Sequence, residues 1–94
     1  MSQDLSKYKV SIFGETYTLV SDENEEHIIK IARVVDAMMQ DIARQTELSD
    51  TKRIAVLAAL SFANEIASLR RQLEDQRSMQ TRLIEKIEQG LAIL

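Results

Sequence analysis

The residues best suited to chemistry lie in one short acidic stretch. His27 is the sole histidine of the chain, and Glu23 precedes it by four residues, so both side chains would share one face of a helix. Such a pair imitates half of a metal site or a general acid–base pair. Glu25 and Glu26 place two more carboxylates beside it.

Neither chemistry is supported by the surrounding sequence. Zinc sites use three or four protein ligands, and the chain has no cysteine to supply thiolates. Paired catalytic carboxylates need a pocket with two different environments, whereas these acids suit the first turns of a helix, where the helix dipole favours negative charge. The serines fall at predicted caps or on exposed helix faces, and no glycine-rich phosphate loop is present. We therefore predict a solvated His27, no metal, no cofactor and no enzymatic activity.

Charge and composition narrow the remaining classes of function. Residues 1–49 carry five bases and nine acids, and residues 50–94 carry seven bases and six acids, for a net charge of −3. Neither half has the basic excess that phosphate-driven nucleic-acid binding needs. The polar N-terminus lacks the apolar core of a signal peptide, and the longest apolar run, 54–60, falls far below the roughly 18 residues of a membrane span. We expect a soluble, non-secreted protein without direct membrane insertion.

A β-hairpin is predicted over residues about 8–20, in the stretch KVSIFGETYTLV. Apolar and polar residues alternate there with a period of two. Gly14-Glu15 is the predicted two-residue loop, with glycine first as a type II′ turn prefers. The resulting register pairs Ile12 with Tyr17 and Val10 with Leu19 on one apolar face. That face needs a cover, because a lone hairpin is marginally stable in water.

A first helix is predicted over residues about 22–46, with Ser21 as its N-cap. Its apolar stripe repeats at three- and four-residue steps. The stripe consists of Ile28, Ile31, Val35, Met38 and Ile42, widened by Ile29, Ala32 and Met39.

A second helix is predicted from about residue 50 to near Leu94, with Ser49 as its cap, because no proline and only one glycine occur in this range. Residues 54–63 are apolar on nearly every side, which indicates burial on every side. One hairpin and one helix cannot surround them, and a head of about 60 residues is near the lower limit for independent stability. A second subunit is therefore expected to contact Ile54, Leu57 and Phe62.

Beyond Asn64 the apolar pattern narrows to a coiled-coil seam. The a and d positions are Ile66, Leu69, Leu73, Gln76, Gln80, Leu83, Ile87, Gly90 and Leu94, so the middle of the seam is polar. Past residue 78 the seam widens through Met79, Ile84, Leu91 and Ile93, which suggests more than two packed helices. We predict an α+β head (1–62), a coiled-coil stalk (63–94), and assembly from dimer to tetramer. The interface residues expected in the stalk are Ile66, Leu69, Leu73, Leu83, Ile84, Ile87 and Leu91.

The order of these segments is that of a known family. The hairpin pattern V-x-I-x-G-x-x-Y-x-L begins at Val10 and is followed by an acidic helix start. The stretches IARVVDAMMQDI, TELSDTKR and IAVLAALSFANEIASL then follow in turn. Over residues about 8–75 the chain resembles the ZapA family of bacterial cell-division proteins.

This resemblance implies a partner and an assembly. The partner is FtsZ, the tubulin-like protein that polymerises beneath the membrane at the division site. The resemblance also implies a cytoplasmic location and dimers formed through the head and the adjoining long helix. These dimers would join tail to tail, through antiparallel coiled coils, into a tetramer that has heads at both ends and bundles FtsZ protofilaments. The alternative is a coiled-coil adaptor of the same architecture with another protein partner.

The resemblance further implies that charged residues of the head meet FtsZ. These include the residue after the hairpin glycine, Glu15, and positions around the interhelix linker such as Glu47. The net negative charge of the head disfavours long-range attraction to an acidic polymer, so local bases or a co-adapted partner surface are the candidates. The candidate bases are Lys9, Lys30, Arg33, Arg44, Lys52 and Arg53.

Overall fold

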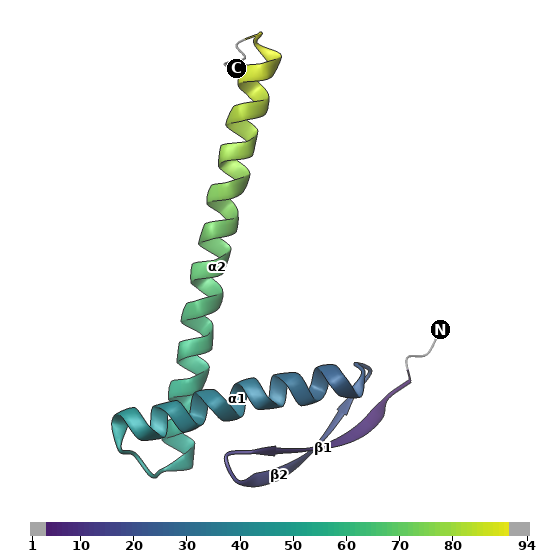
Figure 1. Ribbon diagram of the computed structural model, residues 1–94, viewed down its shortest axis with the longest axis vertical. Helices are drawn as coiled ribbons and strands as arrows, with labels where there is room; N and C mark the ends of the chain where they lie inside the picture. Colours follow the sequence, from purple (N-terminus) through teal and green to yellow (C-terminus); the bar gives the residue numbers. More distant parts are fainter. Residues whose placement is uncertain (1–3, 91–94) are drawn as a thin grey trace. The chain divides into compact units, whose positions relative to one another are not determined.

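The computed structural model describes residues 4–90 of the chain. Its elements are strands β1 (Ser6–Ile12) and β2 (Glu15–Ser21) and helices α1 (Glu25–Thr46) and α2 (Thr51–Glu88), drawn in Figure 1. The predicted hairpin followed by two helices, the second of them long, is confirmed. The chain divides into two compact units between Ala59 and Leu60, and α2 contributes to both.

The hairpin turn lies one residue earlier than the prediction. Its two central residues are Phe13 and Gly14, with φ angles of 50° and 80°, rather than Gly14 and Glu15. Positive φ at both positions matches a type I′ turn, not the predicted type II′. The strands consequently pair Ile12 with Glu15 and Val10 with Tyr17.

Although the predicted loop was wrong, the apolar face predicted for the hairpin is correct. Moving a two-residue turn by one position shifts each cross-strand partner by two residues, and side chains alternate with that period. Val10 therefore still shares a face with Tyr17 and Leu19, although its direct partner is Tyr17 and the partner of Leu19 is Tyr8.

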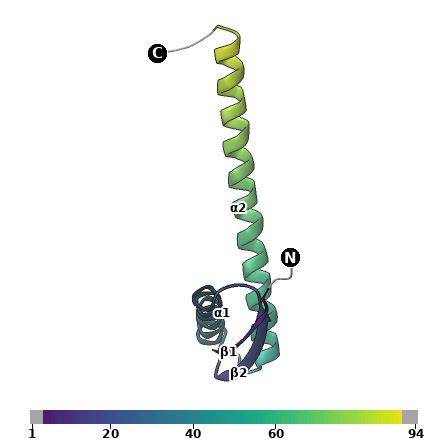
Figure 2. The ribbon, with the colours of Figure 1, turned by 90° about the vertical axis from the view of Figure 1, so that its right-hand side faces the viewer.

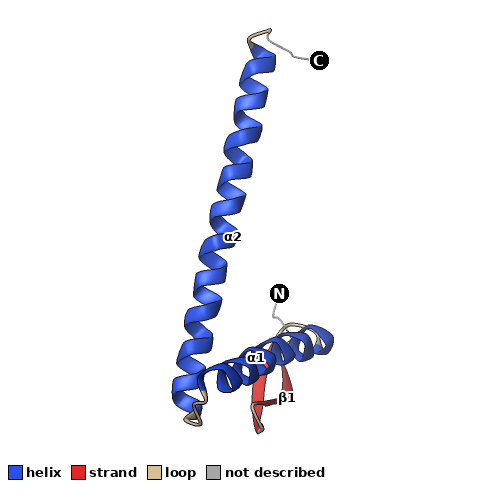
Figure 3. Ribbon diagram, turned by 60° about the vertical axis from the view of Figure 1, so that its left-hand side comes forward, coloured by secondary structure: helices blue, strands red, loops and turns tan. Residues whose placement is uncertain are grey.

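Helix α1 covers this face and forms a small core with it (Figures 2 and 3). The central cluster is Val10 of β1 with Ile28 and Ala32 of α1, exposed by only 6%, 3% and 6%. Partly buried apolar residues pack around the cluster; these are Tyr8, Ile12 and Leu19. The hairpin therefore draws its stability from α1, as its apolar alternation requires.

Helix α1 begins later than predicted because a different residue caps it. Asn24 is the N-cap: its Oδ1 accepts the hydrogen bond of the His27 amide at 2.8 Å. Ser21, the predicted cap, instead accepts the amide of Glu23 at 3.0 Å in the turn before the helix. The Tyr8 hydroxyl also holds that turn, donating to the Glu23 carbonyl at 2.8 Å.

The buried stripe of α1 is narrower than predicted. It consists of Ile28, Ala32, Met39 and Ile42. Ile31 was placed in the stripe but is 42% exposed, and Val34 beside it is 51% exposed. The side of α1 that carries these two residues is therefore not covered by its own chain.

Helix α2 begins after Asp50 instead of Ser49. The Asp50 carboxylate accepts the Lys52 amide at 3.0 Å and its carbonyl accepts the Ile54 amide at 3.1 Å, as an N-cap does. The helix ends at Glu88, before Leu94, because Gly90 adopts a left-handed φ of 76°. Gly90 thus lies outside the helical seam in which it was placed.

The core can be tested with two neighbouring isoleucines. Ile28→Ala removes a side chain that is 3% exposed, whereas Ile29→Ala removes one that is 38% exposed. Large-to-small changes in a core cost about 2–4 kcal/mol, so Ile28→Ala should lower the free energy of unfolding by about that amount and Ile29→Ala by about 1 kcal/mol or less. Chemical denaturation at one fixed protein concentration measures both. Equal losses would contradict the assigned core.

Candidate functional site

The tip of the hairpin is held by a carboxylate from α1. The Phe13 amide donates to Oδ1 of Asp36, 23 residues later, at 2.7 Å, and Asp36 is partly buried. Left-handed φ costs a residue with a side chain about 1–2 kcal/mol. A hydrogen bond to a charged group contributes about 1.5–3 kcal/mol, so this bond offsets the strain at Phe13.

Glu15, predicted to contact a partner, lies directly after this turn and is exposed. The Tyr17 hydroxyl donates to its Oε2 at 3.0 Å. This hydrogen bond, followed by the charge of Glu15 and a smaller effect of burial, raises the pKa of Tyr17 above its usual value of 10.0. The tip therefore presents one negative charge whose side chain is restrained by its neighbour on the same strand.

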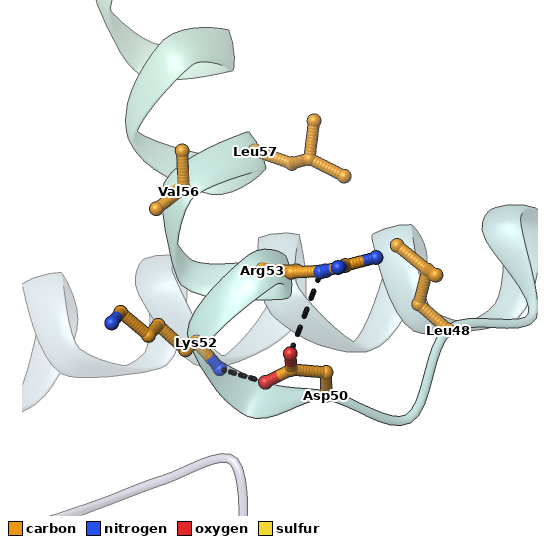
Figure 4. A pocket seen from close by; sticks show the side chains of 6 residues that line it. All are labelled: Leu48, Asp50, Lys52, Arg53, Val56 and Leu57. Atoms are coloured by element: carbon orange, nitrogen blue, oxygen red, sulfur yellow. Dashed lines mark hydrogen bonds and ion pairs between the residues drawn. The ribbon is translucent and has the colours of Figure 1, made fainter.

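A second candidate surface surrounds the linker between α1 and α2. An open hollow of about 530 Å³ is lined by Leu48, Asp50, Lys52, Arg53, Val56 and Leu57, as Figure 4 shows. Its Asp50 carboxylate lies 3.6 Å from Nε of Arg53 and accepts the Lys52 amide at 3.0 Å (Figure 4). Aliphatic side chains beside two cations suit a partner segment that combines an apolar residue with an acid.

The other predicted contact residues lie on α1 and at its end. Lys30 and Arg33 are exposed and line a separate hollow of about 420 Å³ with Ile29. Arg44 forms an ion pair with Asp41 three residues earlier. Glu47 ends α1 with a left-handed φ of 57°. The structure thus places the predicted contacts at the hairpin tip, along α1 and at the linker, rather than in one patch.

The first turns of α2 are covered by their own chain on one side only. Ile54 is fully buried and Ala58 is 3% exposed, whereas Val56 and Leu60 are 54% and 62% exposed. Ile54 was predicted to contact a second subunit, but its side chain has no surface left for one. Leu57 and Phe62, predicted with it, are half-buried and keep part of their surface free.

The predicted seam of α2 is uncovered in the unit that begins at Leu60. Its aliphatic side chains are between 48% and 62% exposed; they are Ile66, Leu69, Leu73, Leu83, Ile84 and Ile87. Leu91, also predicted there, lies outside the described residues. A helix with such a row gains its stability by packing the row against another helix.

Sequence reasoning missed Asp36, because a single acid in a helix is usually read as solvated. A signal was available, since Asp36 follows Ala32 by four residues and precedes Met39 by three, both of which are buried. An acid on a buried face needs a hydrogen-bond donor, and a nearby hairpin turn can supply one.

Comparison with known proteins places this architecture in a family. The sequence profile described as "Cell division protein ZapA" matches residues 8–91. The chain belongs to the ZapA family. Among curated ZapA proteins, that of Bacillus thuringiensis is 31% identical over 77 residues, covering 82% of this chain and 86% of the relative. ZapA of Bacillus licheniformis is 32% identical over 69 residues, covering 73% and 81%.

A solved structure has the same fold. It is described as a ZapA mutant dimer from Geobacillus stearothermophilus, with 29% sequence identity and a TM-score of 0.66. The match covers 85% of this chain and 93% of that one. Within residues 4–90, no group of three or more potential metal ligands comes together, and neither helix is long and apolar enough to cross a membrane.

The contact between Tyr17 and Glu15 can be tested by titration. Because Glu15 favours the neutral phenol, Glu15→Gln should lower the pKa of Tyr17 toward 10.0. An ultraviolet-absorbance titration of tyrosinate follows the change, and a Tyr17→Phe variant separates the signal of Tyr8. Any stability from this bond is present below the ordinary tyrosine pKa and is lost as pH rises through the raised one. An unchanged Tyr17 midpoint in Glu15→Gln would contradict the contact.

Proposed function

We propose that this chain binds FtsZ and crosslinks its protofilaments, so that it promotes and stabilises the ring of FtsZ polymers at the division site. It acts by binding in the cytoplasm and performs no catalysis. The observation that carries the proposal is the row of exposed aliphatic side chains on α2 of a ZapA-family chain, from Ile66 to Ile87. That row can pack against the same row of another copy of the chain. Such self-assembly gives a crosslinker more than one binding head.

The head is proposed to form a dimer. Val56 of α2 and Ile31 and Val34 of α1 are each more than 40% exposed, which leaves much apolar surface open on so small a unit. A second copy would cover this surface, and the related structure from Geobacillus stearothermophilus is described as a dimer. Leu57 and Phe62 are the predicted interface residues that keep surface free for this contact.

Two dimers are proposed to join through the seams of α2, as the resemblance to the family implies. The tetramer then carries binding heads at both of its ends. Once one head is bound, capture of a second filament becomes intramolecular, so a modest affinity per head produces strong bundling. The charged residues of the head would contact FtsZ; they are Glu15, Lys30, Arg33, Arg44, Glu47, Lys52 and Arg53.

Co-sedimentation with FtsZ from the same organism tests the partner. The protein should pellet with polymerised FtsZ and should increase the light scattered by the polymers. A clean negative across a range of salt concentrations would overturn FtsZ as the partner and leave an adaptor for another protein.

A charge placed in the seam tests whether bundling depends on the tetramer, which carries binding heads at both of its ends. Leu83→Glu should break the tetramer and weaken bundling by about tenfold or more, because avidity typically adds 10²–10⁴ to affinity. Ser78→Glu is the matched control, since it adds the same charge at an outer heptad position. Light scattering gives the mass of each variant and the extent of bundling. A Leu83→Glu variant that is dimeric yet bundles like the wild type would contradict the mechanism.

A further inference from the structure

We propose that Asp36 is a positioning residue for partner binding: its carboxylate fixes the Phe13–Gly14 turn and thereby sets how Glu15 is presented. The inference rests on the proposed function, in which the hairpin tip contacts FtsZ. Asp36 acts through the turn, because its Oδ1 accepts the Phe13 amide at 2.7 Å.

The turn needs such an anchor because the core stops short of it. The cluster that attaches the hairpin to α1 centres on Val10, and Ile12 is the last residue of β1 that packs against it. Strand pairing likewise ends at Ile12 and Glu15, which leaves the amide of Phe13 outside the ladder. Asp36 supplies the acceptor for that amide and extends the attachment of the hairpin as far as its tip.

The anchored conformation is also one that the local sequence does not favour. Phe13 has a φ of 50°, although left-handed φ favours glycine, and it is followed by Gly14 at 80°. Without its acceptor the turn is free to sample other conformations of Phe13 and Gly14, including ones that relieve the left-handed φ of Phe13. Each alternative changes the direction of Glu15, so the bond to Asp36 determines what fraction of molecules presents Glu15 from the Phe13–Gly14 turn.

The test compares two substitutions at one position. Asp36→Ala removes the acceptor, whereas Asp36→Asn keeps an oxygen that can accept the Phe13 amide. If the presented conformation falls to about one fifth or one tenth of the molecules, the apparent Kd rises about five- to tenfold. Co-sedimentation with polymerised FtsZ measures the Kd, at a temperature where circular dichroism shows every variant to be folded.

Three comparisons separate positioning from a loss of charge or of stability. Asp22→Ala removes one exposed head carboxylate and should leave the Kd unchanged. Asp36→Asn keeps an acceptor but loses its charge, so it should raise the Kd less than Asp36→Ala and slow the hydrogen exchange of the Phe13 amide, seen by NMR, more than Asp36→Ala does. Gly14→Ala, whose added Cβ meets no atom within 4 Å but is strained at this φ, should disturb the turn and raise the Kd even if Asp36→Ala does not fold.

The outcomes point to different conclusions. Faster exchange at Phe13 together with weaker binding in Asp36→Ala, with both changes smaller in Asp36→Asn, supports the inference. A folded Asp36→Ala variant that binds like the wild type overturns it and leaves the proposed function intact. If Asp36→Ala does not fold, wild-type affinity in Gly14→Ala overturns it. Absence of binding by the wild type overturns the proposed function and the inference together.

Discussion

The head depends first on the apolar contact between α1 and the inner face of the hairpin. Neither partner is stable by itself, since a two-stranded hairpin is marginal in water and an amphipathic helix gains most of its stability by packing. Val10, Ile28 and Ala32 join them, and no polar or charged residue is buried in the described part of the chain. Hydrogen bonds around this contact, such as the one from the Phe13 amide to Asp36, orient the hairpin relative to α1.

The same core is too small to use all of the apolar surface of the head. Met39, Ile42 and Ile54 are buried, yet Val56 and Leu60 remain open to solvent on the first turns of α2. In the proposed assembly a second copy covers them, so that folding and association are thermodynamically coupled. The measured stability of the head should then depend on protein concentration, as it does for obligate dimers.

The features that the sequence predicted correctly are those that depend on the spacing of apolar residues along the chain. Alternation located the hairpin face, and helical spacing located both helices, because each depends on residues near one another in the chain. The turn was misplaced because glycine suits either position of a two-residue loop. The observed turn, Phe13–Gly14, is accompanied by a hydrogen bond from the Phe13 amide to Asp36 on another element. Similarly, Ser21 and Asn24 are both good caps, and which one begins α1 depends on the surrounding packing.

The predicted dimer-interface residues on α2 differ from the exposed ones because the sequence does not show which side chains are buried within the chain itself. An apolar run shows that α2 needs cover but not which chain supplies it, so Ile54 could not be distinguished from Val56 by residue type. The fractional exposure of each side chain separates them: Ile54 belongs to the core of its own chain, and Val56 remains open. The contact residues of the head lack any such signal, because exposed charges occur on every soluble surface.

Within residues 4–90, two residues with side chains, Phe13 and Glu47, adopt left-handed φ. Phe13 lies at the hairpin tip and Glu47 at the linker, which are two of the three places proposed to meet the partner. Glycine would relieve the strain at both positions. Helix ends favour glycine where Glu47 stands, so Glu47→Gly offers an engineer a more stable head. Stabilising changes often reduce function when they fall at functional sites. The same substitution would also remove the Glu47 carboxylate that is proposed to contact the partner. In the proposed assembly, Phe13 and Glu47 are thus positions where partner recognition and folding stability favour different residues.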